Sequence, residues 1–384
     1  MIPGLDGLRA IAILLVFATH SDLAEFGWVG VQLFFVLSGF LITGILLDMK
    51  DSLPAGKYFT KFYGRRFLRI FPLYYFYLAA MAVVAYWLLQ VGFRKSTVQI
   101  FFDQVWSAVF YVYDIFYRAE WFHPAHFLDH FWSLSVEEQF YILWPLLLLI
   151  LPKEHLKKLF IFFIFLGAGF RVLLYLWYLS GDNLWFFREP FGLVVYALPF
   201  SHLDAFAFGA YISRYTIWRP RAQLLVLALL VSTVGFTVTY FTTGSMGAVT
   251  ALGYSLSLGP GYQFVWMYTL LNYFFAVLIY CVVRERFWVR FLEMPWLRYL
   301  GKISYGMYVY HLVLIWFVWE LFEEYGHEGM EHYWIKFAIA LFATILVSAL
   351  SYHFLERPIL NLKDRFFSWS KTSDGEDQRP SAIL

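Results

Sequence analysis

The sequence predicts an all-α, polytopic transmembrane helical bundle of about ten spans, and its composition carries that prediction. The 384 residues are 61% hydrophobic and only 15% charged, a balance that a soluble protein of this length does not have. Runs of about 20 apolar residues, enough to cross a hydrocarbon core of about 30 Å, recur along the chain. Helices satisfy the backbone hydrogen bonds of such runs internally, so the bundle is predicted to be all-helical. The single cysteine, Cys281, excludes an intrachain disulfide.

Ten apolar segments are predicted to cross the membrane. In chain order they are residues 8–21, 28–47, 70–91, 131–151, 158–180, 194–213, 223–242, 263–283, 296–319 and 335–355. A further apolar segment, 98–117, carries polar side chains that are too costly to face lipid, namely Asp103, Gln104, Ser107 and Asp114. It is predicted to be an outward-facing re-entrant or amphipathic segment that lies over the other helices.

The charge of the connecting segments predicts their sidedness. The connection "LDMKDSLPAGKYFTKFYGRRFLRI" is strongly basic, whereas "ELFEEYGHEGMEH" and "SDLAEFG" are acidic. Basic connections stay on the cytoplasmic side, and basic and acidic connections alternate along this chain if there are ten spans and both termini are cytoplasmic. Residues 1–366 are therefore predicted to form one membrane-embedded domain. The hydrophilic residues 367–384 are predicted to be a disordered cytoplasmic tail.

The first predicted span, "GLRAIAILLVFATH", carries Arg9 near its cytoplasmic end and His20 near its outer end. Eleven residues at about 1.5 Å each separate the two by roughly 16 Å along a helix. One elongated ligand could therefore contact both. The alternative is that Arg9 extends to the lipid headgroups as a topology anchor and that His20 only marks a helix end.

Three arginines cluster before the third span, in "FYGRRFLRIFPLYY". Arg65, Arg66 and Arg69 are three and four residues apart, so they share one face of a helix at the cytoplasmic boundary. Guanidinium groups grip phosphates with paired hydrogen bonds, and a phosphate-bearing ligand is one explanation. The alternative is an ordinary basic cluster beside anionic lipid.

The fourth predicted span opens with "DHFWSLSVEEQFYILWP", where His130, Glu137 and Glu138 lie at the level of His20. Carboxylates at a membrane boundary are costly unless they are partnered or functional. A purely structural role in capping this helix start is the alternative. Other polar residues occur within later spans and together favour a shared polar cavity over separate interhelical hydrogen bonds: Arg171, His202, Asp204, Ser304, Tyr308 and His311.

Seven stretches of the chain, taken in order, resemble the acyltransferase 3 family of integral membrane acyltransferases. They are "LDGLRAIAILLVFATH", "GVQLFFVLSGFLITGILL", "FYGRRFLRIFPLYY", "FWSLSVEEQFYILWP", "SHLDAFAFGA", "GKISYGMYVYHL" and "SYHFLERP", and they run from residue 4 to 358. The resemblance implies transfer of an acyl group, most often acetyl, from cytoplasmic acyl-coenzyme A to a hydroxyl. The acceptor would be a glycan, a cell-surface polysaccharide or a glycosylated small molecule. The resemblance further implies a plasma (inner) membrane enzyme of the cell envelope.

The resemblance also implies roles for single residues. His20 resembles the family's essential first-helix histidine, and Arg9, Arg66 and Arg69 match its basic motifs. The family's S-x-x-E-E-Q-F and S-Y-x-x-Y-x-x-H patterns are matched here by Glu137, Glu138, Tyr308 and His311. One departure is His202, which stands where the family usually has an arginine two residues before the aspartate, here Asp204. Any acceptor-binding role copied to that position is in doubt.

These residues support a hypothesis for the chemistry. The donor phosphates would bind Arg65, Arg66, Arg69 and Arg9, and the thioester would reach His20, the general base. Glu137, with Glu138 as second choice, would orient the imidazole, and Tyr308 or His311 would donate to the developing oxyanion. Direct transfer and a short-lived acyl-histidine both fit. The acceptor is expected to contact five residues: Tyr308, His311, Arg171, Asp204 and His130.

No tightly bound cofactor and no metal site are expected, because the histidines lack ligand-like spacing. The expected partners are acyl-coenzyme A, a carbohydrate or lipid-linked glycan acceptor and the lipid bilayer, with no nucleic acid. A separate extracytoplasmic partner or a homo-oligomer is also possible, since many family members carry an additional C-terminal domain. The main alternative is a transporter or flippase with a polar intramembrane path, although the hydropathy pattern contains no inverted repeat. A sensor or scaffold that binds an acylated lipid without turnover is the third hypothesis.

Overall fold

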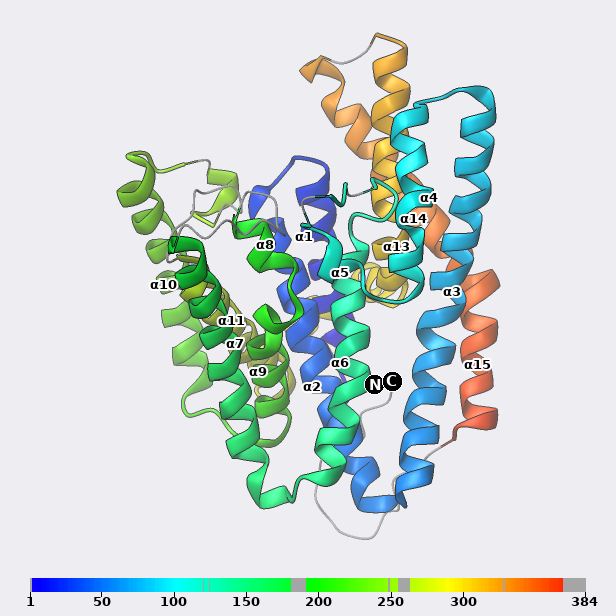
Figure 1. Cartoon of the computed structure of the whole chain (residues 1–384). Coiled ribbons are helices and arrows are strands. Elements are labelled where there is room, and N and C mark those ends of the chain that lie inside the picture. The colour runs from blue at the N-terminus through cyan, green and yellow to red at the C-terminus, as the bar shows by residue number, and fades with distance from the viewer. Residues whose placement is uncertain are drawn as a thin grey trace.

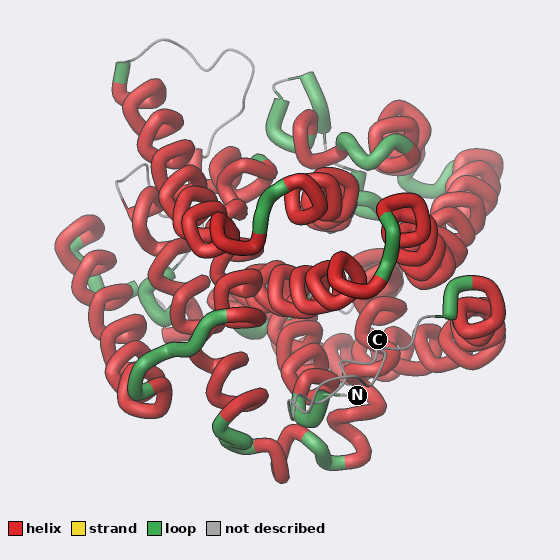
Figure 2. The backbone as a smooth tube through the Cα atoms, turned by 90° about the horizontal axis from the view of Figure 1, so that it is seen from below, coloured by secondary structure: helices red, strands yellow, loops and turns green. Residues whose placement is uncertain are grey.

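The computed structural model describes residues 2–119, 121–123, 125–180, 191–247, 249–254, 263–326 and 329–368. Within these ranges the chain forms helices and loops and no β-strand, as the ribbon in Figure 1 and the view from below in Figure 2 both show. The predicted all-α class is confirmed. The predicted tail falls almost entirely outside the described residues.

The helices follow the predicted apolar segments closely. In chain order they are α1 (Leu5–His20), α2 (Val29–Ser52), α3 (Ala55–Val91), α4 (Lys95–Val109), α5 (Tyr113–Phe116), α6 (Phe131–Ile150), α7 (Leu156–Leu179), α8 (Phe191–Ala197), α9 (Leu203–Arg214), α10 (Pro220–Thr243), α11 (Gln263–Arg284), α12 (Val289–Leu292), α13 (Pro295–Glu324), α14 (Tyr333–Ser351) and α15 (Arg357–Phe366). A π-helical turn, η6 (Tyr352–Glu356), joins α14 to α15, and short 3-10 turns η1 (Glu25–Trp28), η2 (Lys153–His155), η3 (Pro199–His202), η4 (Val249–Ala251) and η5 (Met330–His332) lie in other connections.

Eight of the described helices are long and apolar enough to cross a membrane, and nine are if α8 and α9 count as one bent span. The bend between α8 and the η3–α9 segment is 76°. The remaining predicted span is the first, 8–21. It corresponds to α1, which has only 16 residues and is about 24 Å long. The chain is therefore a multi-pass helical bundle, and the prediction of about ten spans agrees with it.

The segment 98–117 does not form a span. Helix α4 doubles back along α3, and the short helix α5 then packs against α6 (Figure 1). Gln139 of α6 fixes this arrangement, because its side-chain amide donates hydrogen bonds to the Tyr111 carbonyl at 3.0 Å and to Asp114 at 2.9 Å. Polar side chains of the segment thus find partners in the protein and avoid lipid, as a re-entrant segment requires.

Helix α2 lies at the centre of the bundle and packs on α1, α3, α6, α9 and α11. Its closest neighbour is α9, and glycines make the close approach possible. A Cβ at Gly39 would overlap the carbonyl of Phe206, and a Cβ at Gly209 would overlap the carbonyl of Val36. Small residues allow helix backbones to approach in this way, which gains van der Waals contact in a membrane.

Helix α1 packs mainly on α13, so the first and ninth predicted spans are neighbours. A Cβ at Gly301 of α13 would overlap the carbonyl of Asp6, which fixes how closely the two helices approach. The start of α1 is held by Glu293, whose carboxylate accepts a 2.6 Å hydrogen bond from the backbone N–H of Gly4. Gly4 has φ of 85°, a left-handed conformation that glycine adopts without strain.

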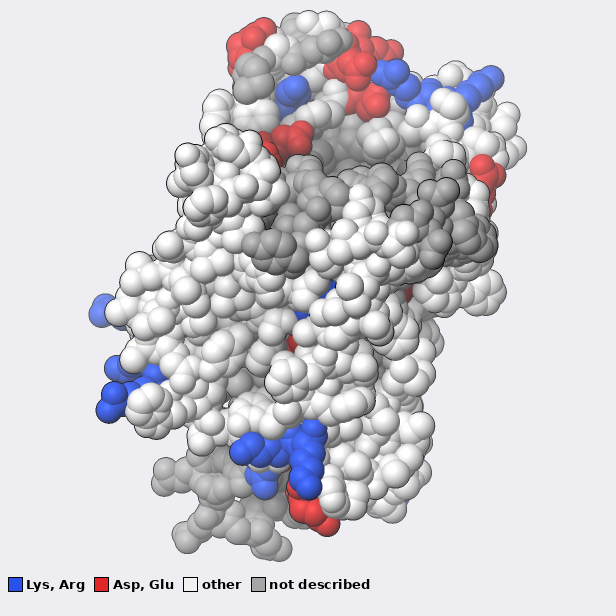
Figure 3. All heavy atoms as spheres, turned by 60° about the vertical axis from the view of Figure 1, so that its left-hand side comes forward, with Lys and Arg blue, Asp and Glu red and all other residues white. Residues whose placement is uncertain are grey.

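Most of the charged side chains visible in Figure 3 lie toward the two ends of the bundle, and fewer are visible between them. Basic side chains gather toward the lower part of the face shown there, and acidic ones are prominent at the upper end. Lys and Arg side chains are also visible at the upper end.

Candidate functional site

Five helices line a partly open cavity, which we call the inner cavity. The space in it that no atom fills is about 900 Å³, including solvent at its opening. It lies between α1, α2, α3, α6 and α13, so residues far apart in the sequence share its wall. Its lining is largely apolar at α2 and polar elsewhere. The polar and aromatic residues that line it are Arg9, Phe34, Phe35, Ser38, Arg66, Arg69, Ser133, Glu137, Glu138, Tyr141, Ser304, Tyr305 and Tyr308.

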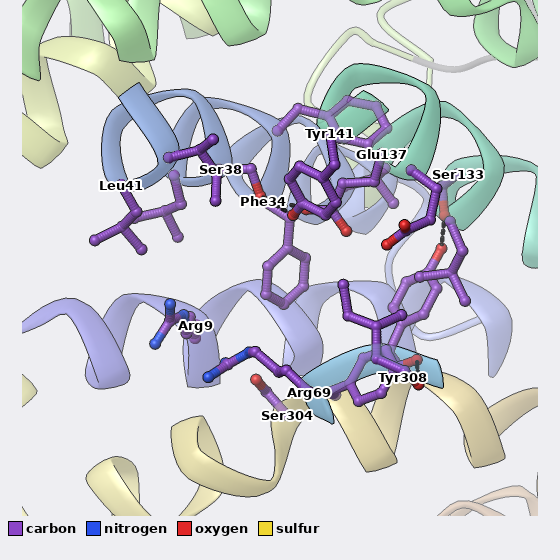
Figure 4. Close-up of a pocket in the computed structure, with 18 of the residues that line it drawn as sticks. Arg9, Phe34, Ser38, Leu41, Arg69, Ser133, Glu137, Tyr141, Ser304 and Tyr308 are labelled. Carbon is purple, nitrogen blue, oxygen red and sulfur yellow. Dashed lines mark hydrogen bonds between the residues drawn. The ribbon is translucent and has the colours of Figure 1, made fainter. Parts of the chain in front are cut away.

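Three arginines line the inner cavity. Arg9 comes from α1, whereas Arg66 and Arg69 come from adjacent turns of α3 (Arg9 and Arg69 in Figure 4). Arg9 is held by Asp6, one turn earlier, with Nη1 to Oδ1 at 3.2 Å. Arg66 lies over the ring of Tyr141 at 5.1 Å, a cation–π contact that holds its guanidinium in place. No carboxylate among the described residues forms a salt bridge with Arg66 or Arg69, so both keep donors for an anion.

Arg65, the third member of the predicted α3 cluster, does not line the inner cavity. It donates a 3.1 Å hydrogen bond to the carbonyl of Phe367, beyond the end of α15. The three arginines share one broad face by spacing, but 100° of rotation per residue turns Arg65 toward α15. Arg65 was predicted to act together with Arg66 and Arg69. In the structure it contacts the Phe367 carbonyl and does not line the cavity that the other two line.

Two adjacent carboxylates of α6 both line the inner cavity. Glu137 accepts a hydrogen bond from Ser38 of α2, and the same hydroxyl lies 3.2 Å from that of Tyr141. Glu138 is 8% exposed and lies close enough to Arg66 for their charges to attract. Adjacent helical residues point about 100° apart, yet the cavity is wide enough to take both.

Tyr308 and Ser133 lie at the opposite end of the inner cavity from the guanidinium groups of Arg9 and Arg69 (Figure 4). The two hydroxyls share a hydrogen bond, and the Tyr308 hydroxyl also lies 3.2 Å from the carbonyl of His130. This pair ties α13 to the start of α6. Tyr308 therefore presents a hydroxyl donor to the cavity from a fixed position.

Three histidines pack together next to Tyr308. The ring of His311 lies 5.1 Å from the ring of His20 and 5.0 Å from that of His130, centroid to centroid. His311 Nδ1 bonds the carbonyl of Tyr308 at 2.6 Å, and His130 Nε2 bonds that of Val309 at 3.0 Å. Because a carbonyl only accepts, both bonded nitrogens carry the proton in the neutral rings. The other nitrogens, His311 Nε2 and His130 Nδ1, are buried acceptors that have no hydrogen-bond partner among the described residues.

His20 does not line the inner cavity, and no hydrogen bond joins it to Glu137 or Glu138 among the described residues. The carboxylates whose charges act on the His20 ring belong to Asp129 and Asp22. Glu137 instead faces the cavity from a point lower on α6, about 10 Å along the axis from the position of His130. The predicted partnership of Glu137 or Glu138 with His20 is thus not present in this conformation.

Arg171 and Asp204 form a buried ion pair in another part of the bundle and do not line the inner cavity. The pair is bidentate, with Nη2 to Oδ2 at 2.8 Å and Nη1 to Oδ1 at 3.3 Å. Asp204 also accepts hydrogen bonds from Thr269 at 2.7 Å and Asn272 at 3.0 Å, and Arg171 donates to the Val265 carbonyl at 3.1 Å. These contacts join α7, α9 and α11. In this structure the pair therefore holds three helices together, and its predicted contact with the acceptor stays a prediction.

His202, the residue that departs from the family pattern, is equally enclosed. Its Nδ1 accepts from the Gln32 amide at 3.1 Å, and its Nε2 lies 2.6 Å from the carbonyl of Tyr196. Both ring nitrogens are satisfied, so this side chain bridges α2 and the turn before α9.

Several cavity residues were not singled out from the sequence. Ser38, Ser133 and Tyr141 supply hydroxyls to the inner cavity, and Glu356 lines an adjoining cavity described below. All four stand within the stretches that carry the family resemblance, which was the available signal. No group of three His, Cys, Asp or Glu side chains within the described ranges is placed to hold a metal ion.

The fold and the cavity define a multi-pass helical membrane protein with cationic side chains at one end of an internal pocket and imidazoles beside the other. Residues 2–353 match the family described as Acyltransferase domain. This chain belongs to that acyltransferase family, as its motifs predict.

Named relatives lie in Staphylococcus aureus. The chain is 27% identical over 383 residues to a protein of strain COL named "Putative O-acetyltransferase", an overlap of 96% of this chain and 59% of the relative. It is 26% identical over 406 residues to O-acetyltransferase OatA of strain NCTC 8325, an overlap of 100% of this chain and 61% of the relative. The chain thus spans about three fifths of the length of these relatives. No solved structure matches it.

Proposed function

We propose that the protein is an O-acetyltransferase that moves an acetyl group from cytoplasmic acetyl-coenzyme A to a hydroxyl of a glycan. The observation that supports this most directly is the layout of the inner cavity. Guanidinium groups of Arg9 and Arg69 lie at one end, and the Tyr308 hydroxyl, beside the histidine cluster, lies at the other. A long substrate with phosphates at one terminus and a reactive carbonyl at the other suits this arrangement.

The donor side of the proposal rests on charge and length. Arg9, Arg66 and Arg69 bind phosphate oxygens through charge-assisted hydrogen bonds. The α1 helix is continuous from Leu5 to His20, so the sequence-based separation of roughly 16 Å between Arg9 and His20 stands. An extended pantetheine arm covers such a span. It places the thioester at the Tyr308 end of the cavity while the phosphates stay at the arginine end.

The acceptor hydroxyl approaches from the His20 side. His20 takes its proton, the hydroxyl oxygen bonds to the thioester carbonyl carbon, and the carbon–sulfur bond breaks. The proton then passes to the leaving thiolate, which gives free coenzyme A and the acetyl ester. Tyr308 lines the inner cavity and packs against His311, and His311 in turn packs against His20. The two substrates therefore meet at these residues.

Of the two oxyanion donors predicted from the sequence, Tyr308 is favoured over His311. The Tyr308 hydroxyl faces the cavity and carries a proton that it can redirect from Ser133 to an oxyanion. In His311 the protonated Nδ1 is committed to the Tyr308 carbonyl, so the neutral ring offers only an acceptor at Nε2. His311 and His130 are better suited to accept hydrogen bonds from acceptor hydroxyls.

The proposed sidedness puts the arginine end of the inner cavity toward the cytoplasm of the plasma (inner) membrane, with both chain ends on that side. The acetyl group of a cytoplasmic donor would then reach an outward-facing acceptor, and the complete donor molecule would not have to cross the membrane. Single cysteines at Asp51 and Ser245, introduced in a Cys281→Ala background, test this. A membrane-impermeant thiol reagent added to intact cells should label only Ser245→Cys, and labelling of Asp51→Cys instead would contradict the proposal.

The function is tested with purified protein in detergent, radiolabelled acetyl-coenzyme A and a panel of glycan acceptors. Thioester consumption coupled to labelled ester formation is the expected result. Reconstituted liposomes distinguish the enzyme from a transporter. Uptake of label without thioester consumption would support the transporter and contradict the proposed enzyme. Donor binding without either turnover or uptake would favour the sensor hypothesis.

A further inference from the structure

A second cavity, with about 1290 Å³ of empty space, opens beside the inner cavity. We call it the entrance cavity. Arg9, Leu41, Arg69 and Tyr305 line both, so the two cavities adjoin at these four residues. Its other walls come from the start of α1, from α13, and from η6 and α15, which sequence analysis left without a role.

Cationic side chains dominate the entrance cavity. Its lining includes five Lys or Arg residues, Arg9, Arg69, Lys302, Arg357 and Lys363, and two carboxylates, Asp6 and Glu356. Asp6 is already paired with Arg9, and buried Glu356 accepts a hydrogen bond from Ser351 at 3.3 Å. Lys302 and Arg357 are exposed and form no salt bridge with a described residue. The cavity therefore carries an excess of positive charge.

The π-helical turn η6 builds the outer wall of this cavity. One extra residue in the turn shifts the register of the chain between α14 and α15, and such turns occur often at functional sites. The turn brings Glu356 inward, where its carboxylate lies 3.3 Å from the position a Cβ would take at Gly306. It also brings Arg357 and the aromatic ring of Tyr352 to the same cavity.

The geometry points to the entrance cavity as the binding site for the nucleotide part of the donor, an adenosine bearing a 3′-phosphate and a 5′-pyrophosphate. This inference rests on the proposed function. Arg9 and Arg69 stand where the two cavities join, so a pyrophosphate bound there sends its pantetheine arm into the inner cavity. The adenosine must then lie in the entrance cavity. Lys302 and Arg357 bind its 3′-phosphate, and Tyr352 offers a face for the base.

The test uses adenosine 3′,5′-bisphosphate, which has the phosphates but no thioester, and measures its binding to the full chain in detergent by calorimetry. Lys302→Ala and Arg357→Ala should each weaken binding about 10-fold, the loss of one charge-assisted contact. Arg365→Ala is the matched control, because Arg365 is an exposed cation on the same helix that does not line the cavity. Lys302→Arg should keep most of the affinity.

A second arm separates the inference from the proposed function. Both alanine variants should weaken acetyl-coenzyme A to the same degree and leave turnover of S-acetylpantetheine, which lacks the nucleotide, unchanged. If wild-type protein consumes acetyl-coenzyme A but these variants bind the nucleotide normally, the inference fails while the function stands. If wild-type protein neither binds nor consumes acetyl-coenzyme A, the function itself fails.

Anionic lipid headgroups carry the same phosphate chemistry, and a third arm distinguishes them. Bisphosphate affinity is measured in micelles with and without phosphatidylglycerol. A nucleotide site should keep its affinity and its dependence on Lys302 and Arg357 in both. Loss of the bisphosphate signal in phosphatidylglycerol micelles, with equal effects of Arg365→Ala, would assign these cations to lipid and overturn the inference.

Discussion

His20 is the residue on which acceptor activation depends in the proposed mechanism. It ends α1 and packs against His311, whose own Nδ1 is held by a backbone carbonyl. Of the three clustered histidines, His20 is partly exposed, whereas His130 and His311 are almost fully buried. A side chain in this position is reachable by an acceptor and is rigidly supported from behind.

Replacement of His20 by alanine should lower acetyl transfer by about 10²- to 10⁴-fold, the usual contribution of a general base. Donor affinity should stay within about twofold, because His20 does not line the inner cavity. Steady-state kinetics and calorimetry with acetyl-coenzyme A check the two halves. His155→Ala, an exposed histidine in η2, serves as the control. Equal losses of transfer and donor binding would remove His20 from the role of base.

The double variant Arg66→Ala with Arg69→Ala should weaken acetyl-coenzyme A binding by at least about 10-fold, because both guanidiniums line the inner cavity. Arg65→Ala, one residue away, should leave donor affinity unchanged, because Arg65 faces the Phe367 carbonyl. Calorimetry gives the dissociation constants of acetyl-coenzyme A for the double variant and for Arg65→Ala, and their comparison tests the assignment. A larger effect from Arg65 than from the pair would reverse the assignment.

At the residue scale, the spacing of residues within one helix predicts which side chains share a face of that helix. It does not predict which side chains of two different helices contact each other. The i, i+3 spacing of Arg66 and Arg69 and the motif around Glu137 located side chains that the structure brings to one cavity. The same reasoning grouped Arg65 with them and paired Glu137 with His20. The structure gives Arg65 and Glu137 other contacts, because a sequence gives no rotation of α3 against α15 and no depth of α6 relative to α1.

At the scale of elements, the α2–α9 crossing determines whether the central helix keeps its place. Gly39→Ala should destabilise the protein by about 1–3 kcal/mol, since the added methyl group meets the backbone of Phe206. Gly44→Ala is the matched control in the same helix, with nothing within 4 Å of its added Cβ. The apparent Tm in detergent checks both. Equal midpoints for the two variants would show that this crossing is looser than described.

The Arg171–Asp204 pair is expected to act on stability and only indirectly on catalysis. Asp204→Ala leaves a guanidinium buried without its counterion, which costs about 3–5 kcal/mol. The apparent Tm should fall well below that of Gly39→Ala. Where folded protein is recovered at low temperature, its acceptor KM should match wild type. A raised acceptor KM with a normal Tm would instead return Asp204 to the acceptor site.

Among the elements, the apolar runs predicted the long helices well, because hydrophobicity over about 20 residues is a strong local signal. The segment 98–117 was correctly kept out of the span count by its polar residues. The 76° bend before α9 and the π-helical turn at Tyr352 were not predictable. A bend and a π-helical turn both leave backbone N–H and C=O groups without their usual partners in the helix. Whether neighbouring helices supply hydrogen-bond partners for these groups depends on the tertiary structure.

At the scale of the whole molecule, the bundle combines two kinds of interior. Helices α1, α2, α3, α6 and α13 leave a cavity between them, into which Arg66 and Arg69 extend without a salt bridge to any described residue. Helices α7, α9 and α11 instead close around a fully paired Arg171 and Asp204. Composition and sidedness predicted a polar interior, but only the folded chain separates the polar residues that line a cavity from those that hold helices together.

The central claim is that one donor molecule extends from the arginines to the Tyr308 end of the inner cavity. A structure of the protein with a non-reactive oxygen analogue of acetyl-coenzyme A tests it most directly. The account predicts pyrophosphate oxygens within hydrogen-bond reach of Arg9 and Arg69, and the acetyl carbonyl beside the Tyr308 hydroxyl. A donor bound with its acetyl group at the arginine end, or outside both cavities, would contradict it.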